Sequence, residues 1–275
     1  MTLFQALLLG ILQGVTEFLP ISSSGHLVLL QHIFGLREPE LAFDVFVHVA
    51  TLLAVVVVYR RDVWALLVAC PGIPASLRPQ LPRESKELVL YRRLGLFVLL
   101  ANVPTALIGL YVATAFEHLF AAPWAVGVAL LASGVLLWSL KSQMTGSRGL
   151  ENLGVKHAFI LGVVQGLAVI PGLSRSGSTI VAALWCGMQR QEAARFSFLM
   201  ALPAILGAAV LESRKLDLAL GPSLSVLLIG MSGALLVGYI ALRFLLRLLS
   251  QGQLWRFAFY CWVIGLGAIG YSLLA

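Results

Sequence analysis

Long apolar segments separated by short polar connections make up most of the chain. An α-helix needs about 20 apolar residues to cross the hydrocarbon core of a bilayer. Six segments come close to this length, near residues 43–59, 94–114, 121–140, 195–212, 222–242 and 254–274. The pattern therefore predicts an all-α polytopic membrane protein with six spanning helices.

Two further apolar regions, residues 2–34 and 157–188, are broken in the middle by Pro, Gly and Ser. Such a break frees backbone groups that hydrocarbon cannot satisfy, so it has to lie inside protein or against water. We interpret each region as a re-entrant hairpin, in which a helix enters the membrane, breaks into a loop and returns as a second helix. The alternative is a pair of kinked packing helices with small residues at close contacts.

The two broken regions are related in sequence. Residues 10–15 (GILQGV) recur as residues 162–167 (GVVQGL), and the pair Ser24-Gly25 recurs as Ser176-Gly177 at the same offset. Three predicted spans separate the hairpins, so the second must enter from the opposite side and the repeat is inverted. We expect a single membrane domain, 1–275, with inverted repeats of approximately 1–140 and 157–275 and cytoplasmic loops near 60–93 and 141–156.

Composition and charge support this membrane assignment. Hydrophobic residues make up 60% of the chain and charged residues 11%, with a mean hydropathy of +0.95, whereas charged residues approach a quarter of a soluble domain. The net charge of +7 is dispersed over the connections, which argues against nucleic acid as a partner. If the first hairpin enters from outside, 15 of the 19 basic residues fall on the inner side, Arg78 and Arg83 among them, and only Arg37, Arg214 and Lys215 fall outside. The positive-inside rule demands this asymmetry.

Glu17 is the first candidate for chemistry, because it lies in an otherwise apolar helix. An acidic residue at the bilayer centre costs about 2.5–3.5 kcal/mol on insertion scales, so it needs a partner or a function. Gln13 precedes it by four residues, which places both side chains on one helix face. They could converge on a common ligand or simply form a hydrogen bond within the helix.

Arg175 is the second candidate and lies at the second break, among Ser174, Ser176, Ser178 and Thr179. A guanidinium offers a planar fork of fixed positive charge, and hydroxyl groups and helix N-termini add further donors, a combination that suits phosphate. The alternative is a structural ion pair between Arg175 and Glu17, which would itself join the two halves.

His26 follows three serines, Ser22, Ser23 and Ser24, at the first break. An imidazole titrates near neutral pH and could transfer a proton, although an ordinary hydrogen-bonded interior histidine would look the same. Asp44 and His48 are also four residues apart on the next span. They could border the same pocket or lie solvated at the level of the lipid headgroups.

Together these motifs resemble the undecaprenyl-pyrophosphate phosphatase family, also called the bacitracin-resistance family, over nearly the whole chain. Residues 9–26 (LGILQGVTEFLPISSSGH) are similar to its first signature, in which Glu or Gln precedes Glu and a P-x-S-S-[ST]-G-H loop follows. Residues 171–179 (PGLSRSGST) are similar to its P-G-x-S-R-S-G-x-T signature, and residues 195–203 to its F-S-F…P stretch. Gln13 is the neutral option at its position, so it cannot offer a cation a second carboxylate.

The resemblance implies hydrolysis of undecaprenyl pyrophosphate to the monophosphate and inorganic phosphate, with a divalent cation, Mg²⁺ or Ca²⁺. It implies recycling of the lipid carrier for peptidoglycan and other cell-wall glycans, bacitracin resistance, and a multi-pass protein of the bacterial inner membrane with a site open toward the periplasm. The catalytic candidates are Glu17, Ser23, His26 and Arg175, with Glu17 also the metal ligand. The substrate-binding candidates are Gln13, Ser22, Ser24, Ser174, Ser176 and Thr179.

Several alternatives stay open from the sequence alone. Either Ser23 or a water molecule could attack the terminal phosphorus. A transporter or flippase of a lipid phosphate would use the same inverted repeat with broken helices, and a non-catalytic scaffold would leave the buried charges without a function. The expected partners are the polyprenyl pyrophosphate and the membrane, without nucleic acid. The oligomeric state, a homodimer included, is not determined by the sequence.

Overall fold

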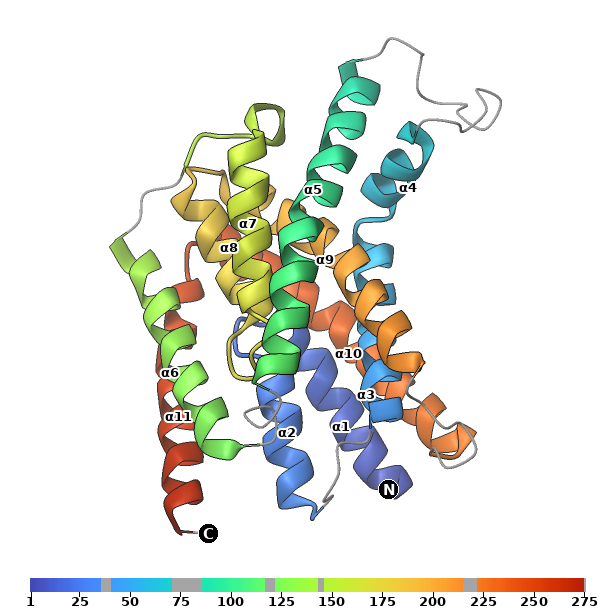
Figure 1. Ribbon diagram of the computed structural model, residues 1–275, viewed down its shortest axis with the longest axis vertical. Helices are drawn as coiled ribbons and strands as arrows, with labels where there is room; N and C mark the ends of the chain where they lie inside the picture. Colours follow the sequence, from blue (N-terminus) through green and yellow to red (C-terminus); the bar gives the residue numbers. More distant parts are fainter. Residues whose placement is uncertain (36–40, 71–85, 117–121, 143–145, 215–221, 275) are drawn as a thin grey trace.

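The computed structural model describes residues 1–35, 41–70, 86–116, 122–142, 146–214 and 222–274, and these parts are mainly α-helical (Figure 1). The helices are α1 (Leu3–Phe18), α2 (Ser23–Ile33), α3 (Leu41–Val58), α4 (Arg60–Ala69), α5 (Lys86–Ala115), α6 (Pro123–Trp138), α7 (Val155–Leu167), α8 (Arg175–Trp185), α9 (Arg190–Ser213), α10 (Leu224–Ser250) and α11 (Phe257–Leu274). Three short 3₁₀ turns are η3 (Ser139–Ser142), η4 (Leu150–Asn152) and η5 (Leu254–Arg256). The all-α prediction is confirmed.

Within the described residues, five helical segments are long and apolar enough to cross a membrane: Lys86–Ala115, Pro123–Ser142, Arg190–Ser213, Leu224–Ser250 and Leu254–Leu274. A sixth is obtained if α3 and α4 are one span, bent by 87° at their junction. The protein is therefore a multi-pass membrane protein, and the predicted six spans agree with this count when the bent pair is taken together.

Side-chain exposure on α5 follows the pattern expected of a helix that faces lipid. Leu96, Leu99, Val103 and Leu107 recur at helical spacing and are each more than half exposed. The opposite face, which includes Ala101, is buried against the rest of the protein. An apolar stripe of this length on the outside of a helix would be unfavourable in water and is ordinary in a bilayer.

The two predicted hairpins are present as helix–turn–helix units. In Figure 1, α1 and α2 occupy the lower half of the molecule, α7 and α8 occupy the upper half, and the two turns lie near the middle. Helix α1 ends at Phe18, two residues before Pro20, and α7 ends at Leu167, four residues before Pro171. Proline cannot continue a helix and disfavours helical backbone in the residue before it. That these hairpins are re-entrant in a membrane and form an inverted repeat stays a prediction.

Glycines of the repeated sequence make corresponding contacts in the two halves. A Cβ added at Gly10 of α1 would lie 2.2 Å from the carbonyl oxygen of Gly230 on α10, and one at Gly162 of α7 would lie 2.0 Å from that of Ala101 on α5. Only glycine permits backbones to approach so closely. Each hairpin thus packs against one long helix through a glycine of the repeated sequence.

The predicted loop near 60–93 differs from the structure at both ends. Residues Arg60–Ala69 form α4, and α5 already begins at Lys86. A polar network holds the bend between α3 and α4: Asp62 accepts hydrogen bonds from Arg195 of α9 and, at 2.9 Å, from the hydroxyl of Tyr91 on α5. The charged start of α4 is therefore folded against its neighbours, while the rest of the predicted loop, 71–85, lies outside the described residues.

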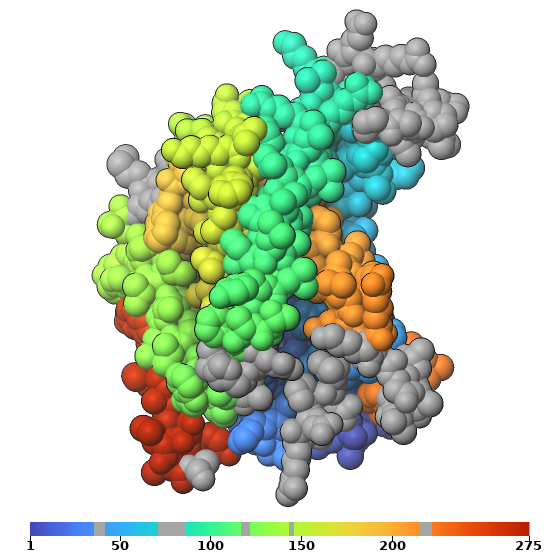
Figure 2. Space-filling view, viewed as in Figure 1, coloured from blue at the N-terminus to red at the C-terminus, as the bar shows by residue number. Residues whose placement is uncertain are grey.

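Some of the basic residues used to predict the orientation also lie outside the described residues, namely Arg37, Arg78, Arg83 and Lys215. The orientation and the cytoplasmic placement of the loops stay predictions. Figure 2 shows α5, α6 and α7 over much of one face of the molecule.

Candidate functional site

The turns of both hairpins are built in the same way. Ser22 is the N-cap of α2 and accepts a hydrogen bond from the backbone N–H of Gly25 at 3.4 Å. Ser174 is the N-cap of α8 and accepts one from Gly177 at 3.1 Å. Serine at an N-cap satisfies one of the free N–H groups that begin every helix. Two helix N-termini therefore point into the interior of the protein.

The two turns touch each other directly. The N–H of Gly172 donates to the hydroxyl oxygen of Ser22 at 3.0 Å, although 150 residues separate them along the chain. Ser22 has a positive φ of 69°, the only such non-glycine residue in the described chain, a backbone conformation that costs free energy and is frequent at functional sites. The contact places the N-termini of α2 and α8 side by side.

Helix α6 supports the second turn through Ser133, which the sequence analysis did not identify. Its hydroxyl donates to the carbonyl oxygen of Gly172 at 2.9 Å and accepts from the N–H of Ser174 at 2.9 Å. Gly172 has a φ of +95°, and a Cβ there would lie 2.4 Å from the carbonyl oxygen of Val126. The turn is thus held closely against α6, which requires glycine at this position.

Glu17 is buried at the end of α1 and lies at the centre of a polar cluster. Its Oε2 accepts hydrogen bonds from Gln13 Nε2 at 2.9 Å and Ser23 Oγ at 2.6 Å. Its Oε1 pairs with the guanidinium of Arg175. Four of the predicted site residues, from three helices and both halves of the chain, are therefore brought together in one network.

The ion pair does not use all the hydrogen-bonding capacity of these side chains. Arg175 Nη1 and Gln13 Oε1 are buried and have no partner in the described part of the chain. A buried polar atom without a partner costs about 1–3 kcal/mol, so a guanidinium nitrogen and an amide oxygen left free beside one carboxylate indicate a place for a ligand. A purely structural ion pair would not account for them.

His48, on α3, borders the cluster around Glu17. His48 Nε2 lies 3.7 Å from Glu17 Oε2. Its Nδ1 is 2.7 Å from the carbonyl oxygen of Asp44. Because a carbonyl can only accept, Nδ1 donates to it, and Nε2 is the ring nitrogen that faces Glu17. The carboxylate of Asp44 accepts from Gln31 at 2.9 Å.

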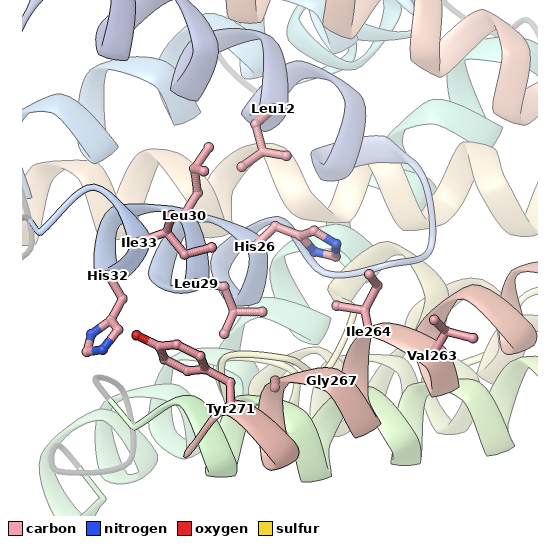
Figure 3. A pocket seen from close by; sticks show the side chains of 11 residues that line it. Leu12, His26, Leu29, Leu30, His32, Ile33, Val263, Ile264, Gly267 and Tyr271 are labelled. Atoms are coloured by element: carbon pink, nitrogen blue, oxygen red, sulfur yellow. The ribbon is translucent and has the colours of Figure 1, made fainter. Parts of the chain in front are cut away.

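His26 does not hydrogen-bond to the cluster around Glu17. Its Nδ1 lies 2.7 Å from the carbonyl oxygen of Ser22, and its Nε2 lies 2.9 Å from the hydroxyl of Tyr260 on α11. His26 also lines an apolar cavity of about 530 Å³ between α1, α2 and α11. Figure 3 shows the cavity extending from His26, past Leu29 and Gly267, to His32 and Tyr271. His26, a polar residue near the start of α2, thus lies at one end of an apolar groove.

The remaining hydroxyl candidates hydrogen-bond mainly within the turns. Ser24 lies 3.4 Å from the hydroxyl of Ser22, and Ser174 lies 3.4 Å from that of Ser176. Thr179 interacts with the backbone of α8 and with the hydroxyl of Ser197 on α9, which the sequence analysis did not identify as a site residue. These residues hold the two turns in place, and their hydroxyls do not reach the carboxylate of Glu17 in a hydrogen bond among the described residues.

A divalent cation would find a mixed set of donors here. The described residues contain no group of three or more His, Cys, Asp or Glu side chains able to hold a metal ion. Glu17, Nε2 of His48 and the free oxygen of Gln13 do fit a cation that takes its other ligands from phosphate and water, the usual mode for Mg²⁺. They do not fit a site formed entirely by protein ligands.

The fold and the site define a class: a multi-pass membrane protein with an acid and an arginine paired between two inward helix N-termini. Comparison with known proteins gives the family, because the profile described as "Bacitracin resistance protein BacA" matches residues 6–267. The chain is 45% identical over 272 residues to an undecaprenyl-diphosphatase of Desulfosudis oleivorans, covering 95% of each chain. It is 42% identical over 270 residues to one of Carboxydothermus hydrogenoformans, covering 96% of this chain and 95% of that protein. The chain belongs to the BacA family.

Proposed function

We propose that this protein is an undecaprenyl-diphosphatase, which hydrolyses undecaprenyl pyrophosphate to undecaprenyl phosphate and inorganic phosphate. The observation that carries the proposal is the pairing of Glu17 with Arg175 between two helix N-termini, with one free guanidinium nitrogen. The names of the relatives support the same activity. In the cell it would recycle the lipid carrier for peptidoglycan and other glycans and confer resistance to bacitracin.

Positioning and charge neutralisation provide most of the rate in phosphoryl transfer. In the proposed complex Arg175 and the N-termini of α2 and α8 hold the phosphate oxygens, as helix N-termini do in other phosphate sites. Glu17, with Gln13 and His48 beside it, would hold Mg²⁺ or Ca²⁺. When bound, the cation would neutralise charge on the diphosphate.

The attacking oxygen belongs either to Ser23 or to a water molecule. Ser23 Oγ donates to Glu17 Oε2 at 2.6 Å, so Glu17 is placed to accept its proton as the oxygen bonds to the terminal phosphorus. The bond from that phosphorus to the bridging oxygen then breaks and undecaprenyl phosphate leaves. Attack by Ser23 requires a second step in which water hydrolyses the phosphoserine, whereas attack by water releases phosphate at once.

We propose that the apolar groove receives the part of the prenyl chain next to the diphosphate. The groove begins at His26. Nδ1 of His26 hydrogen-bonds to the carbonyl oxygen of Ser22, and the hydroxyl of Ser22 contacts Gly172 in the second turn. The phosphate attached to the prenyl chain would then lie nearest His26. This placement suits His26 as the residue that takes up a proton from water at Nε2 and passes it to the departing phosphate.

The proposed environment is the bacterial inner membrane, with the site open toward the periplasm. The charge asymmetry of the sequence supports this orientation. A flippase of the same lipid is the alternative, because inverted repeats with broken helices also serve alternating access.

Phosphate release from detergent-purified protein tests the function. Hydrolysis should proceed without sealed compartments and should stop with EDTA. Absence of release, together with movement of the lipid between leaflets of intact vesicles, would favour the flippase instead. Recovery of a phosphoserine in a stopped reaction would identify Ser23 as the nucleophile.

A further inference from the structure

We infer that Tyr260 of α11 is a positioning residue that holds the imidazole of His26 in one orientation. The inference rests on the proposed function, because it concerns the residue proposed there to transfer a proton. Tyr260 belongs to neither of the two signatures that contain the other site residues. It lies 234 positions from His26 along the chain.

The hydrogen bonds of His26 determine which nitrogen carries its proton. Nδ1 lies 2.7 Å from the carbonyl oxygen of Ser22, and because a carbonyl only accepts, Nδ1 is protonated. In the neutral imidazole Nε2 is then an acceptor, so the hydroxyl of Tyr260, 2.9 Å away, donates to it. The two rings are also stacked, with centroids 5.7 Å apart and planes inclined by 13°. The imidazole is thus fixed through both nitrogens and one face.

The hydroxyl of Tyr260 is presented by a helix that is itself firmly held. The next residue, Cys261, is fully buried and directs its thiol at the carbonyl oxygen of Pro20 in the first turn, at 3.6 Å. Four residues further on, Gly265 meets Gly127 of α6 so closely that a Cβ there would lie 2.8 Å from a carbonyl oxygen. Tyr260 and Cys261, two consecutive residues of α11, therefore contact the first hairpin. Because α11 also packs closely against α6, it cannot shift without moving α6.

This arrangement has a consequence for catalysis. The partner of one imidazole nitrogen decides the state of the other, so the protons that His26 exchanges pass through Nε2, on the side that faces α11 and the groove. Without the hydroxyl of Tyr260 the ring would keep its bond to Ser22 but lose its second restraint. The rate of the chemical step should then fall, while binding of the diphosphate by Arg175 should be unaffected.

The test compares Tyr260→Phe, which keeps the ring and removes the hydroxyl, with Tyr239→Phe on α10. Tyr239 is similarly exposed, 38% against 41%, and lies outside the site. Because Tyr260→Phe removes one hydrogen bond of modest strength, it should lower kcat about three- to tenfold with KM unchanged. In ¹⁵N NMR of the histidine-labelled protein, the unprotonated-nitrogen signal that His26→Gln removes should shift in Tyr260→Phe and stay in place in Tyr239→Phe.

Combining the variants separates this inference from the proposed function. In the His26→Gln background, Tyr260→Phe should cause no further loss of kcat, because its effect acts through the imidazole. If His26→Gln alone kept normal turnover, the proposed role of His26 would be wrong. If His26→Gln lost turnover while Tyr260→Phe kept both kcat and the His26 signal, the role of Tyr260 would be overturned and that of His26 would stand.

Discussion

Arg175 contributes a fork of two nitrogens, one paired with Glu17 and the other free in the interior. We expect Arg175→Ala and Arg175→Lys to lower turnover about 100-fold or more, the size of effect seen when a donor to transition-state charge is removed. An ammonium is a point charge and does not reproduce the fork. Phosphate release and thermal unfolding should be measured together, with Arg60→Lys at the exposed start of α4 as the control. Normal turnover in both Arg175 variants would contradict the phosphate-binding role.

Glu17→Gln keeps the shape of the side chain and removes its charge. The variant should lose rate and respond more weakly to Mg²⁺ at the same time, because the amide is a poorer ligand and a poorer proton acceptor. A titration of phosphate release with Mg²⁺ measures both effects. If the rate fell while the half-saturating Mg²⁺ concentration stayed as in the native protein, Glu17 would not be a cation ligand.

The sequence was sufficient to select Glu17 and Arg175 as site residues, with their ion pair as an alternative reading, because both are charges that a membrane protein must have a reason to bury. It could not show that His26 meets Tyr260 or that Ser133 supports the second turn. Tyrosine is common in helices near a membrane surface, and serine is common at contacts between helices. Neither residue therefore indicates a functional site by itself. Such partners become visible only when the helices are packed.

At the scale of elements, α11 forms one wall of the proposed prenyl groove and offers a matched pair of glycines. A Cβ added at Gly267 or at Gly270 would meet no atom within 4 Å, and of the two only Gly267 lines the groove. Gly267→Leu should therefore raise KM for polyprenyl diphosphates, a short one such as farnesyl diphosphate included, because the groove is proposed to hold the part of the chain that long and short substrates share. Gly270→Leu should leave KM unchanged. Equal effects of both variants on KM would place the prenyl chain elsewhere.

The elements that the sequence predicted were the ones with a strong apolar pattern. Helix α4 was missed because its first three residues, Arg60, Arg61 and Asp62, read as the start of a polar connection. The structure resolves the ambiguity through tertiary contacts, since Asp62 is paired with Arg195 and Tyr91 from two other helices. Local pattern alone could not show that a charged segment had partners distant in sequence.

At the scale of the whole molecule, the predicted topology can be tested by fusing reporter enzymes to the chain. Six spans and two hairpins that return to their own sides place the C-terminus outside and the connection near 141–156 inside. A reporter active only in the periplasm should therefore be active after residue 275 and inactive when inserted near residue 148. The opposite pattern would invert the orientation and the predicted access to the site.

The halves of the chain resemble each other in packing but not in chemistry. Gln165 corresponds to Gln13 in the repeated sequence, and its amide oxygen is likewise buried without a partner in the described chain. The amide nitrogen of Gln165 donates to the hydroxyl of Thr105 at 3.3 Å, and Val169 stands where the first half has Glu17. The repeat could therefore be predicted because glycines and glutamines recur in both halves. Glu17 has no acidic counterpart in the second half, so only the first half contributes a carboxylate at this position.

The ion pair between Glu17 and Arg175 has a thermodynamic consequence for ligand binding. While empty, the cluster is electrically balanced, with one carboxylate facing one guanidinium. A diphosphate arriving alone would create an excess of negative charge, and a divalent cation arriving alone an excess of positive charge, so each should increase the affinity for the other. Because such coupling is reciprocal, lipid and cation should bind as a cooperative pair, and neither should accumulate in the site by itself.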